Sequence, residues 1–228
     1  MPHGNELRSI RFTAGGGAEV SAVLLRPPEA KALLVLGHGA GAGMHHRFMD
    51  AIARRLATVS LATLRYQFPY MEAGARRPDP QPILLATVRS AVAVALKEAP
   101  QLPLLAGGKS MGGRMTSMAA AQQPLDGVRG IVFLGFPLHP AARPSTGRAE
   151  HLSDVTVPML FLAGTRDKLA GLDLLRPVCD GLGDAARLHV VEGADHSFAV
   201  LKRSGRTDDE VLDELAATTR TWVAELVP

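Results

Sequence analysis

A serine between two glycines, in the pentapeptide Gly108-Lys109-Ser110-Met111-Gly112, is the feature of this chain that could perform covalent chemistry. An apolar run, 102–106, leads into the pentapeptide, and a helix-compatible run, 114–122, follows it. A sharp turn from strand to helix brings neighbouring backbone very close, and glycine on both sides leaves room for it. The pattern therefore predicts that the Ser110 hydroxyl projects above the edge of a sheet as a nucleophile.

Two later residues are of the types that would activate this serine. Near neutral pH a serine hydroxyl needs an imidazole to take its proton, and the imidazole needs an acceptor that fixes its tautomer. Asp167 follows the apolar run 157–163, and His196 follows a second run, 187–191. Both lie just beyond the carboxyl ends of predicted strands, where an open α/β sheet forms its ligand crevice. We therefore predict a catalytic triad of Ser110, Asp167 and His196.

Such a triad also needs donors for the negative charge that develops on the carbonyl oxygen of the substrate. Two backbone N–H groups aimed at that oxygen can be worth ~3 kcal/mol of barrier each. We expect one from Met111, which follows the nucleophile, and the other from the glycine-rich loop 37–43. Within that loop Ala40 is the first choice and Gly41 the second. His38 is expected to brace the loop by hydrogen bonds rather than to act as a base.

Alternating short apolar runs and helical patterns must position these groups. Apolar alternation at 10–12 and 19–23, interrupted by three glycines, predicts an antiparallel hairpin at the edge of a sheet. Beyond it, apolar runs too short for helices are each followed by a helical pattern, which predicts a mostly parallel α/β sheet covered on both faces. The expected strands are 33–36, 60–64, 104–106, 131–134, 159–163 and 188–191, and the expected helices are 46–57, 83–97, 111–122, 172–182 and 208–226.

Taken together, these motifs resemble those of the α/β-hydrolase superfamily, and the chain is similar to small members without a full cap domain. His38-Gly39, the turn at Ser110, Asp167 and His196 match the motifs of that superfamily one by one. The longer stretches 37–43, 66–74 and 136–140 resemble a narrower branch that includes testis-expressed hydrolase-like proteins and a subunit of a histone acetyltransferase complex. Dienelactone hydrolases are more distant relatives. The resemblance spans about residues 33 to 222 and implies a fold and a triad rather than a substrate.

Two long connections, 66–82 and 136–158, are expected to border the site, because long ordered loops at this edge of a sheet often form walls or lids. The second lies where larger relatives insert a helical cap, and its modest length predicts an open, shallow site. The residues that we expect to contact the substrate are Gly39, Gly41, Phe68, Tyr70, Met71 and Leu138.

Three alternative interpretations of single residues are weaker. Gly-Lys-Ser after a strand resembles the end of a phosphate-binding loop, but position 103 holds proline where that pattern requires glycine. Lys109 is therefore expected to be a solvated surface cation. His45 and His46 have no partners at metal-ligand spacing and are expected at the start of a helix. For the acid of the triad, Asp173 is the second choice, whereas Asp195 is expected to point away from His196.

Composition narrows the classes of protein further. The 228 residues fit one domain, 1–228, and no apolar run reaches the ~20 residues needed to cross a bilayer. The polar N-terminus lacks the apolar core of a signal peptide, and the single cysteine, Cys179, is expected to be buried. The formal charge of +3 is spread along the chain without a basic stripe. We therefore expect a cytoplasmic monomer or homodimer that binds neither nucleic acid nor a membrane.

The function that these residues favour is hydrolysis of a small-molecule carboxylic ester or thioester through an acyl-enzyme on Ser110. This reaction needs no metal and no organic cofactor. Two alternatives stay open. An acyltransferase would use the same triad with an alcohol in place of water, and a non-catalytic binding or scaffold protein could keep the fold without the activity. The complete set of triad residues argues against the scaffold.

Overall fold

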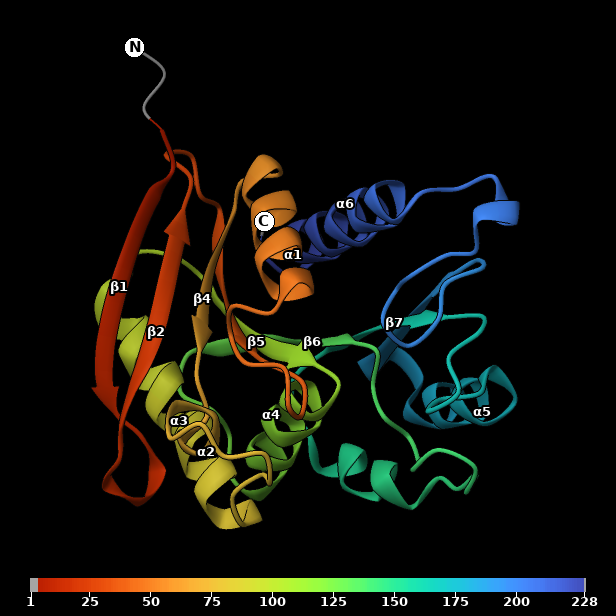
Figure 1. The fold of residues 1–228 in the computed structure, drawn as a ribbon, viewed down its shortest axis with the longest axis horizontal. Helices are drawn as coiled ribbons and strands as arrows, with labels where there is room; N and C mark the ends of the chain where they lie inside the picture. Colours follow the sequence, from red (N-terminus) through yellow and green to blue (C-terminus); the bar gives the residue numbers. More distant parts are fainter. Residues whose placement is uncertain (1–3, 228) are drawn as a thin grey trace.

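The computed structural model describes residues 4–227, which form one eight-stranded sheet in the order β1-β2-β4-β3-β5-β6-β7-β8 (Figure 1). The first two strands form an antiparallel pair at the edge, β2 is antiparallel to β4, and the remaining neighbours are parallel. The predicted mostly parallel sheet with an antiparallel N-terminal hairpin is thus confirmed. The strands are β1 (Glu6–Thr13), β2 (Glu19–Arg26), β3 (Ala32–Gly37), β4 (Leu61–Tyr66), β5 (Leu104–Lys109), β6 (Val128–Leu134), β7 (Met159–Gly164) and β8 (Ala186–Val191).

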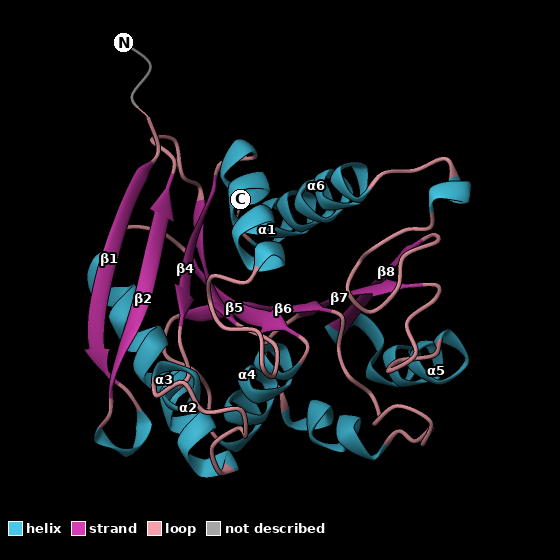
Figure 2. Ribbon diagram, in the orientation of Figure 1, coloured by secondary structure: helices cyan, strands magenta, loops and turns pink. Residues whose placement is uncertain are grey.

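Helices cover both faces of the sheet, as Figure 2 shows. Successive strand residues point to opposite faces, so a central strand covered on both sides is apolar at nearly every position. Leu34 and Leu105 pack in one core with α1 and α6, whereas Leu33 and Leu104 pack in a second core with α3, α4 and α5. The helices are α1 (Arg47–Thr58), α2 (Pro69–Glu72), α3 (Gln81–Glu98), α4 (Met111–Gln122), α5 (Leu172–Leu182) and α6 (Asp208–Leu226).

Helix boundaries follow the sequence pattern closely, and strand boundaries follow it less well. Helices α4, α5 and α6 have the predicted limits, and α1 and α3 differ by one or two residues at each end. Strand β4 continues two residues beyond its predicted end, through Arg65 and Tyr66, because both are buried between β2 and β3. Arg65 tolerates burial since it pairs with the carboxylate of Asp50. Because Arg65 is charged, a prediction based on hydrophobicity ended the strand one residue before it.

The two long connections also contain short helical segments that the sequence pattern did not indicate. The first holds α2, which docks on β2 because the Glu72 carboxylate accepts the Ser21 amide at 3.0 Å. The second holds a 3₁₀ segment, Gly147–Asp154. Within residues 4–227, no helix is both long enough and apolar enough to cross a membrane.

Candidate active site

Ser110 is the single residue between β5 and α4, and its backbone adopts φ 50° and ψ −113°. A positive φ at a residue with a side chain is strained and persists only where the surroundings enforce it. Here β3 enforces it by close packing, since a Cβ on Gly108 would lie 2.3 Å and one on Gly112 2.2 Å from the Gly37 carbonyl oxygen. The two flanking glycines therefore allow the turn, which leaves the Ser110 side chain at the carboxyl edge of the sheet.

The three residues predicted to form a triad lie together. His196 Nε2 is 2.9 Å from Ser110 Oγ, and His196 Nδ1 is 2.7 Å from Asp167 Oδ2. The Asp167 side chain is buried, and its second oxygen accepts the Leu169 amide at 2.8 Å. An ionised carboxylate only accepts hydrogen bonds, so Nδ1 carries the imidazole proton and Nε2 is free to accept from the serine hydroxyl. This arrangement is the one required for activating a serine nucleophile.

The loop after β8, residues 193–199, holds His196 through a network of its own hydrogen bonds. Asp195 Oδ1 accepts the amides of Ser197 at 2.8 Å and Ala199 at 3.0 Å, so this carboxylate faces its own loop as predicted. The Gly193 amide donates to Thr165 Oγ1 at 2.9 Å, which ties the loop to the end of β7. Asp195 therefore shapes the loop, and Asp167 is the partner of the imidazole.

Two backbone amides near Ser110 are available as oxyanion donors. Within residues 4–227, neither the Ala40 N–H nor the Met111 N–H has a hydrogen-bond acceptor. The Gly41 N–H, in contrast, donates to the Tyr70 hydroxyl at 3.1 Å. Of the two candidates in the loop after β3, Ala40 is therefore the one with a free donor.

His38 braces this loop from below. The buried imidazole donates from Nδ1 to the Gly39 carbonyl at 2.8 Å, and its Nε2 accepts the Phe68 amide at 3.1 Å. The bond accepted at Nε2 requires the neutral ring, because a protonated imidazole has no free acceptor. Burial lowers the pKa of His38 to about 4, which keeps the ring neutral near pH 7. His38 thus connects the loop after β3 to the segment after β4.

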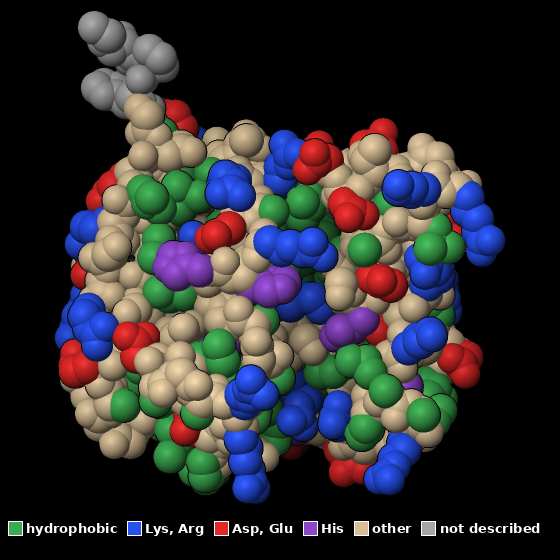
Figure 3. Space-filling model, in the orientation of Figure 1, with side chains coloured by type: hydrophobic (Ala, Val, Ile, Leu, Met, Phe, Trp, Pro, Cys, Tyr) green, Lys and Arg blue, Asp and Glu red, His purple; other side chains and the backbone are tan. Residues whose placement is uncertain are grey.

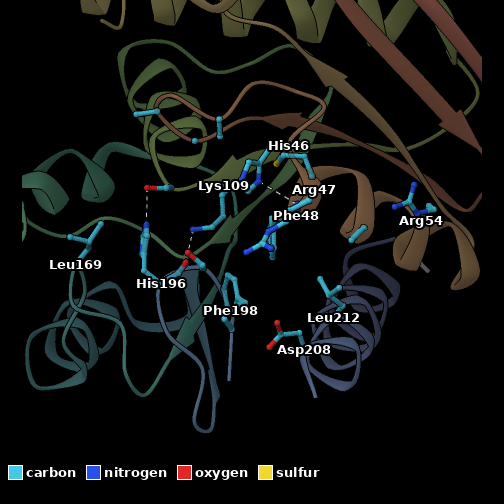
Figure 4. A pocket seen from close by; sticks show the side chains of 18 residues that line it. His46, Arg47, Phe48, Arg54, Lys109, Leu169, His196, Phe198, Asp208 and Leu212 are labelled. Carbon is cyan, nitrogen blue, oxygen red and sulfur yellow. Dashed lines mark hydrogen bonds between the residues drawn. The ribbon is translucent and has the colours of Figure 1, made fainter. Parts of the chain in front are cut away.

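A cavity of about 750 Å³ opens in front of Ser110 and His196, between α1, the loop 193–199 and the start of α6. Figure 3 shows Lys, Arg and His side chains gathered around a hollow on this face of the molecule. Figure 4 shows aromatic and aliphatic side chains from both helices pointing into the cavity beside them. Its apolar walls are Phe48, Met49, Ala51, Leu169, Phe198 and Leu212, and its charged or titratable lining residues are His46, Arg47, Arg54, Lys109, His196 and Asp208.

Most of the residues expected to contact the substrate lie elsewhere. Gly39 lines the cavity, but Phe68 and Leu138 have no exposed surface and Tyr70 is also buried. Met71 is half-buried and, like Gly41, is absent from the cavity wall. The connection after β4 turns its apolar side chains inward, because docking α2 on β2 buries them.

The cavity walls come instead from α1 and from the loop that carries His196. The sequence holds only a partial signal for these walls, an aromatic residue close to each of the two loops. Phe198 stands two residues after His196, and Phe48 follows closely after the glycine-rich loop. The two rings stack on each other with centroids 5.7 Å apart, across a separation that no local pattern could reveal.

Lys109 departs from the sequence-based expectation of a solvated cation. Its side chain is 9% exposed and lies on the sheet face covered by α1 and α6. Strand alternation places it there, because Lys109 points to the same side as Leu105. The expectation was wrong because the loop of His196 covers this position and accepts a hydrogen bond from Lys109 Nζ.

The other residues considered in the sequence analysis lie in helices or at the start of one, where their contacts are structural. His46 accepts the Phe48 amide at 3.3 Å as the N-cap of α1, and Asp173 lies in the first turn of α5. Cys179 is buried, which raises the pKa of its thiol to about 11. In the part of the chain that the structure describes, no group of three or more His, Cys, Asp or Glu side chains is arranged to hold a metal ion.

Comparisons with known proteins agree with this architecture. Residues 30–224 match the model of a family described as alpha/beta hydrolase domain. A dienelactone hydrolase from Anabaena variabilis superposes with a TM-score of 0.76 at 19% identity, covering 99% of this chain and 100% of that one. An α/β serine hydrolase homologue from Coxiella burnetii gives 0.74 at 19% identity, covering 95% and 98%. A serine hydrolase without a lid from Xanthomonas campestris gives 0.73 at 18% identity, covering 95% of each chain.

Proposed function

Since this chain belongs to the alpha/beta hydrolase domain family, we propose that it is a serine hydrolase that cleaves carboxylic esters or thioesters through an acyl-enzyme on Ser110. The resemblance to the α/β-hydrolase superfamily is confirmed by the match to the family model. The observation that carries the proposal is the continuous line of hydrogen bonds from Asp167 through His196 to Ser110.

In the first half of the reaction, Ser110 Oγ attacks the acyl carbon while His196 Nε2 takes the hydroxyl proton. The negative charge that forms on the carbonyl oxygen is stabilised by the Ala40 and Met111 amides. The tetrahedral intermediate then collapses, and the imidazolium gives its proton to the leaving alcohol or thiol. Asp167 keeps the imidazole in the productive tautomer and stabilises its positive charge.

In the second half, water attacks the acyl-enzyme and passes a proton to His196. The second intermediate is stabilised by the same two amides, and its collapse releases the carboxylic acid and restores Ser110. An alcohol in place of water would give acyl transfer through the same steps. Water has direct access because the cavity is open to solvent along one side.

The cavity wall supports an apolar group on the substrate. Phe48, Phe198 and Leu212 present hydrocarbon surface next to the triad, and each methylene buried against such a surface contributes ~0.8 kcal/mol. Farther along α1 than Phe48, Arg54 adds a charge to the lining, and Asp208 adds another from the start of α6. A short acyl chain fits this distribution best.

The test compares a matched ester and thioester with the same acyl group, p-nitrophenyl butyrate and a butyryl thioester, for the wild type and Ser110→Ala. Wild-type protein is expected to hydrolyse at least one of the two, and the variant is expected to lose ~10³-fold or more in kcat, as other serine hydrolases do without their nucleophile. Product analysis in added alcohol separates hydrolysis from acyl transfer. A wild type inactive on both, or a fully active variant, would refute the proposal.

A further inference from the structure

Lys109 comes directly before Ser110 in the chain, but its side chain contacts the loop that carries His196. Its Nζ donates to the backbone carbonyl oxygen of His196 at 2.7 Å, across 87 positions of sequence. In Figure 4 the side chain runs from the end of β5 toward the loop of His196, and a dashed line marks this bond. The contact joins the strand that carries Ser110 directly to the loop that carries the imidazole.

Two aromatic rings complete the surroundings of the ammonium. Lys109 Nζ lies 5.9 Å from the centroid of the Phe48 ring and 5.6 Å from that of Phe198. These distances are within the range at which a cation is attracted to a ring face. Phe48 belongs to α1, whereas Phe198 and the His196 carbonyl belong to the loop 193–199, so the ammonium contacts two separate segments.

The charges that face this ammonium come from several elements. Asp167 and Asp195 favour its protonated form, and burial disfavours it more strongly, so the pKa of Lys109 falls to about 8. The same cavity is lined by His46, Arg47 and Arg54 from α1 and by Asp208 from α6. Among residues 4–227, no carboxylate lies within 4.0 Å of Nζ, so its closest acceptor is the His196 carbonyl. A buried cation without a close counter-ion costs folding free energy.

The His196 imidazole and the Lys109 ammonium also both pack against the backbone of Gly135. A Cβ at this position would lie 3.3 Å from Lys109 Nζ and 3.4 Å from His196 Cε1. Gly135 also has φ +74°, a conformation that favours glycine. The side chains of Lys109 and His196 are thus packed side by side against one backbone segment, and the position of one limits that of the other.

We propose that Lys109 is a positioning residue for the hydrolysis: its charged ammonium holds the His196 backbone and keeps the imidazole within hydrogen-bonding distance of Ser110. The proposal rests on the function proposed above, because it assigns Lys109 a role through His196. On this account, burying the Lys109 ammonium lowers the stability of the fold but serves the activity, because the charge holds His196 in place.

The first test replaces Lys109 by methionine, which keeps an unbranched side chain as far as the ε position and removes both the donor and the charge. Lys168→Met is the matched control, because Lys168 is an exposed lysine next to Asp167. On p-nitrophenyl butyrate we expect Lys109→Met to lower kcat by ~10²-fold, the effect of misplacing a reacting group, with little change in KM. Lys168→Met is expected to behave as the wild type, and Lys109→Arg to recover part of the loss.

A pH profile separates this role from that of a side chain that only fills space. Wild-type kcat is expected to fall on the alkaline side near pH 8 as Lys109 loses its charge. Lys109→Arg should lack this decline because a guanidinium stays protonated. Lys109→Met should be low throughout. A wild-type profile that stays flat into the alkaline range would overturn the proposal, even if Lys109→Met failed to fold.

Failure of this proposal is distinguishable from failure of the proposed function. If the wild type and Lys168→Met hydrolyse the ester and a folded Lys109→Met is equally active, the role of Lys109 is refuted and the hydrolase function stands. If the wild type hydrolyses neither ester nor thioester, the proposed function itself fails. Circular dichroism of each variant shows whether it is folded.

Discussion

The backbone amide of Gly41 donates to the hydroxyl of Tyr70 at 3.1 Å, which ties the loop after β3 to α2. This bond withdraws one of two possible oxyanion donors and leaves the neighbouring Ala40 amide free. It also gives Tyr70, which sequence reasoning assigned to the substrate pocket, a role in holding the donor loop. The two positions are 29 residues apart, so no local motif indicated the contact.

Replacing Tyr70 by phenylalanine is therefore expected to lower kcat without preventing folding. The loss should be smaller than the ~10²- to 10³-fold that follows removal of an oxyanion donor itself, because Ala40 keeps its N–H group. Tyr66→Phe is the matched control, since its hydroxyl is also buried and makes no hydrogen bond to that loop among residues 4–227. Equal steady-state rates for Tyr70→Phe and the wild type would argue against a role for this contact.

Asp167→Asn should reduce kcat by up to ~10⁴-fold, because a neutral amide permits the wrong tautomer of the imidazole. Asp195→Asn should have a much smaller effect, since an amide oxygen can still accept the Ser197 and Ala199 amides. Steady-state kinetics of both variants on the same ester decide between the two acids. A larger loss for Asp195→Asn would mean that Asp167 is not the acid of the triad.

The buried imidazole of His38 predicts a specific dependence of stability on pH. Its pKa is about 4 in the folded protein and about 6.5 when unfolded, so its contribution is complete above 6.5 and is lost as the pH falls through 4. Between about pH 7 and pH 5 the wild type should lose about 2 kcal/mol of unfolding free energy that His38→Gln does not lose. Urea unfolding of both proteins at each pH measures this difference. Parallel losses would show that His38 is not held neutral.

Acyl-chain preference tests the shape of the cavity. Catalytic efficiency on p-nitrophenyl esters is expected to peak at short acyl chains and to fall by the octanoate, because the charged side chains of Arg54 and Asp208 interrupt the apolar lining. Leu212→Ala should weaken the preference within the short chains by removing part of that wall. A steady rise through the dodecanoate would instead indicate a deep, lipid-type pocket.

The sequence predicts that Ser110, Asp167 and His196 lie together, as they do in the structure, because each follows a strand that its own local pattern reveals. Glycines flank Ser110, and apolar runs end just before Asp167 and His196. The limits of α4 and α6 are also set by neighbouring residues. For example, α6 begins with a capping box formed by Thr207 and Glu210. These features depend on neighbours within a few residues.

The cavity could not be predicted in the same way, because its walls meet only in the folded chain. Phe48 and Phe198 are 150 positions apart and stack on each other in the cavity wall. Lys109 is charged and follows two glycines, a pattern typical of an exposed loop. Its burial depends instead on the packing of α1 and the loop 193–199 around it. The residue type thus predicted the charge of Lys109, whereas contacts with residues distant in sequence determine its burial.

The most direct test of the central claim is to locate the nucleophile with a fluorophosphonate, which reacts with an activated serine. Mass spectrometry of the digested protein is expected to find one adduct, on the peptide that contains Ser110. Ser110→Ala should carry none while keeping the circular dichroism spectrum of the wild type. An adduct on a different residue, or no adduct on folded wild-type protein, would contradict the account.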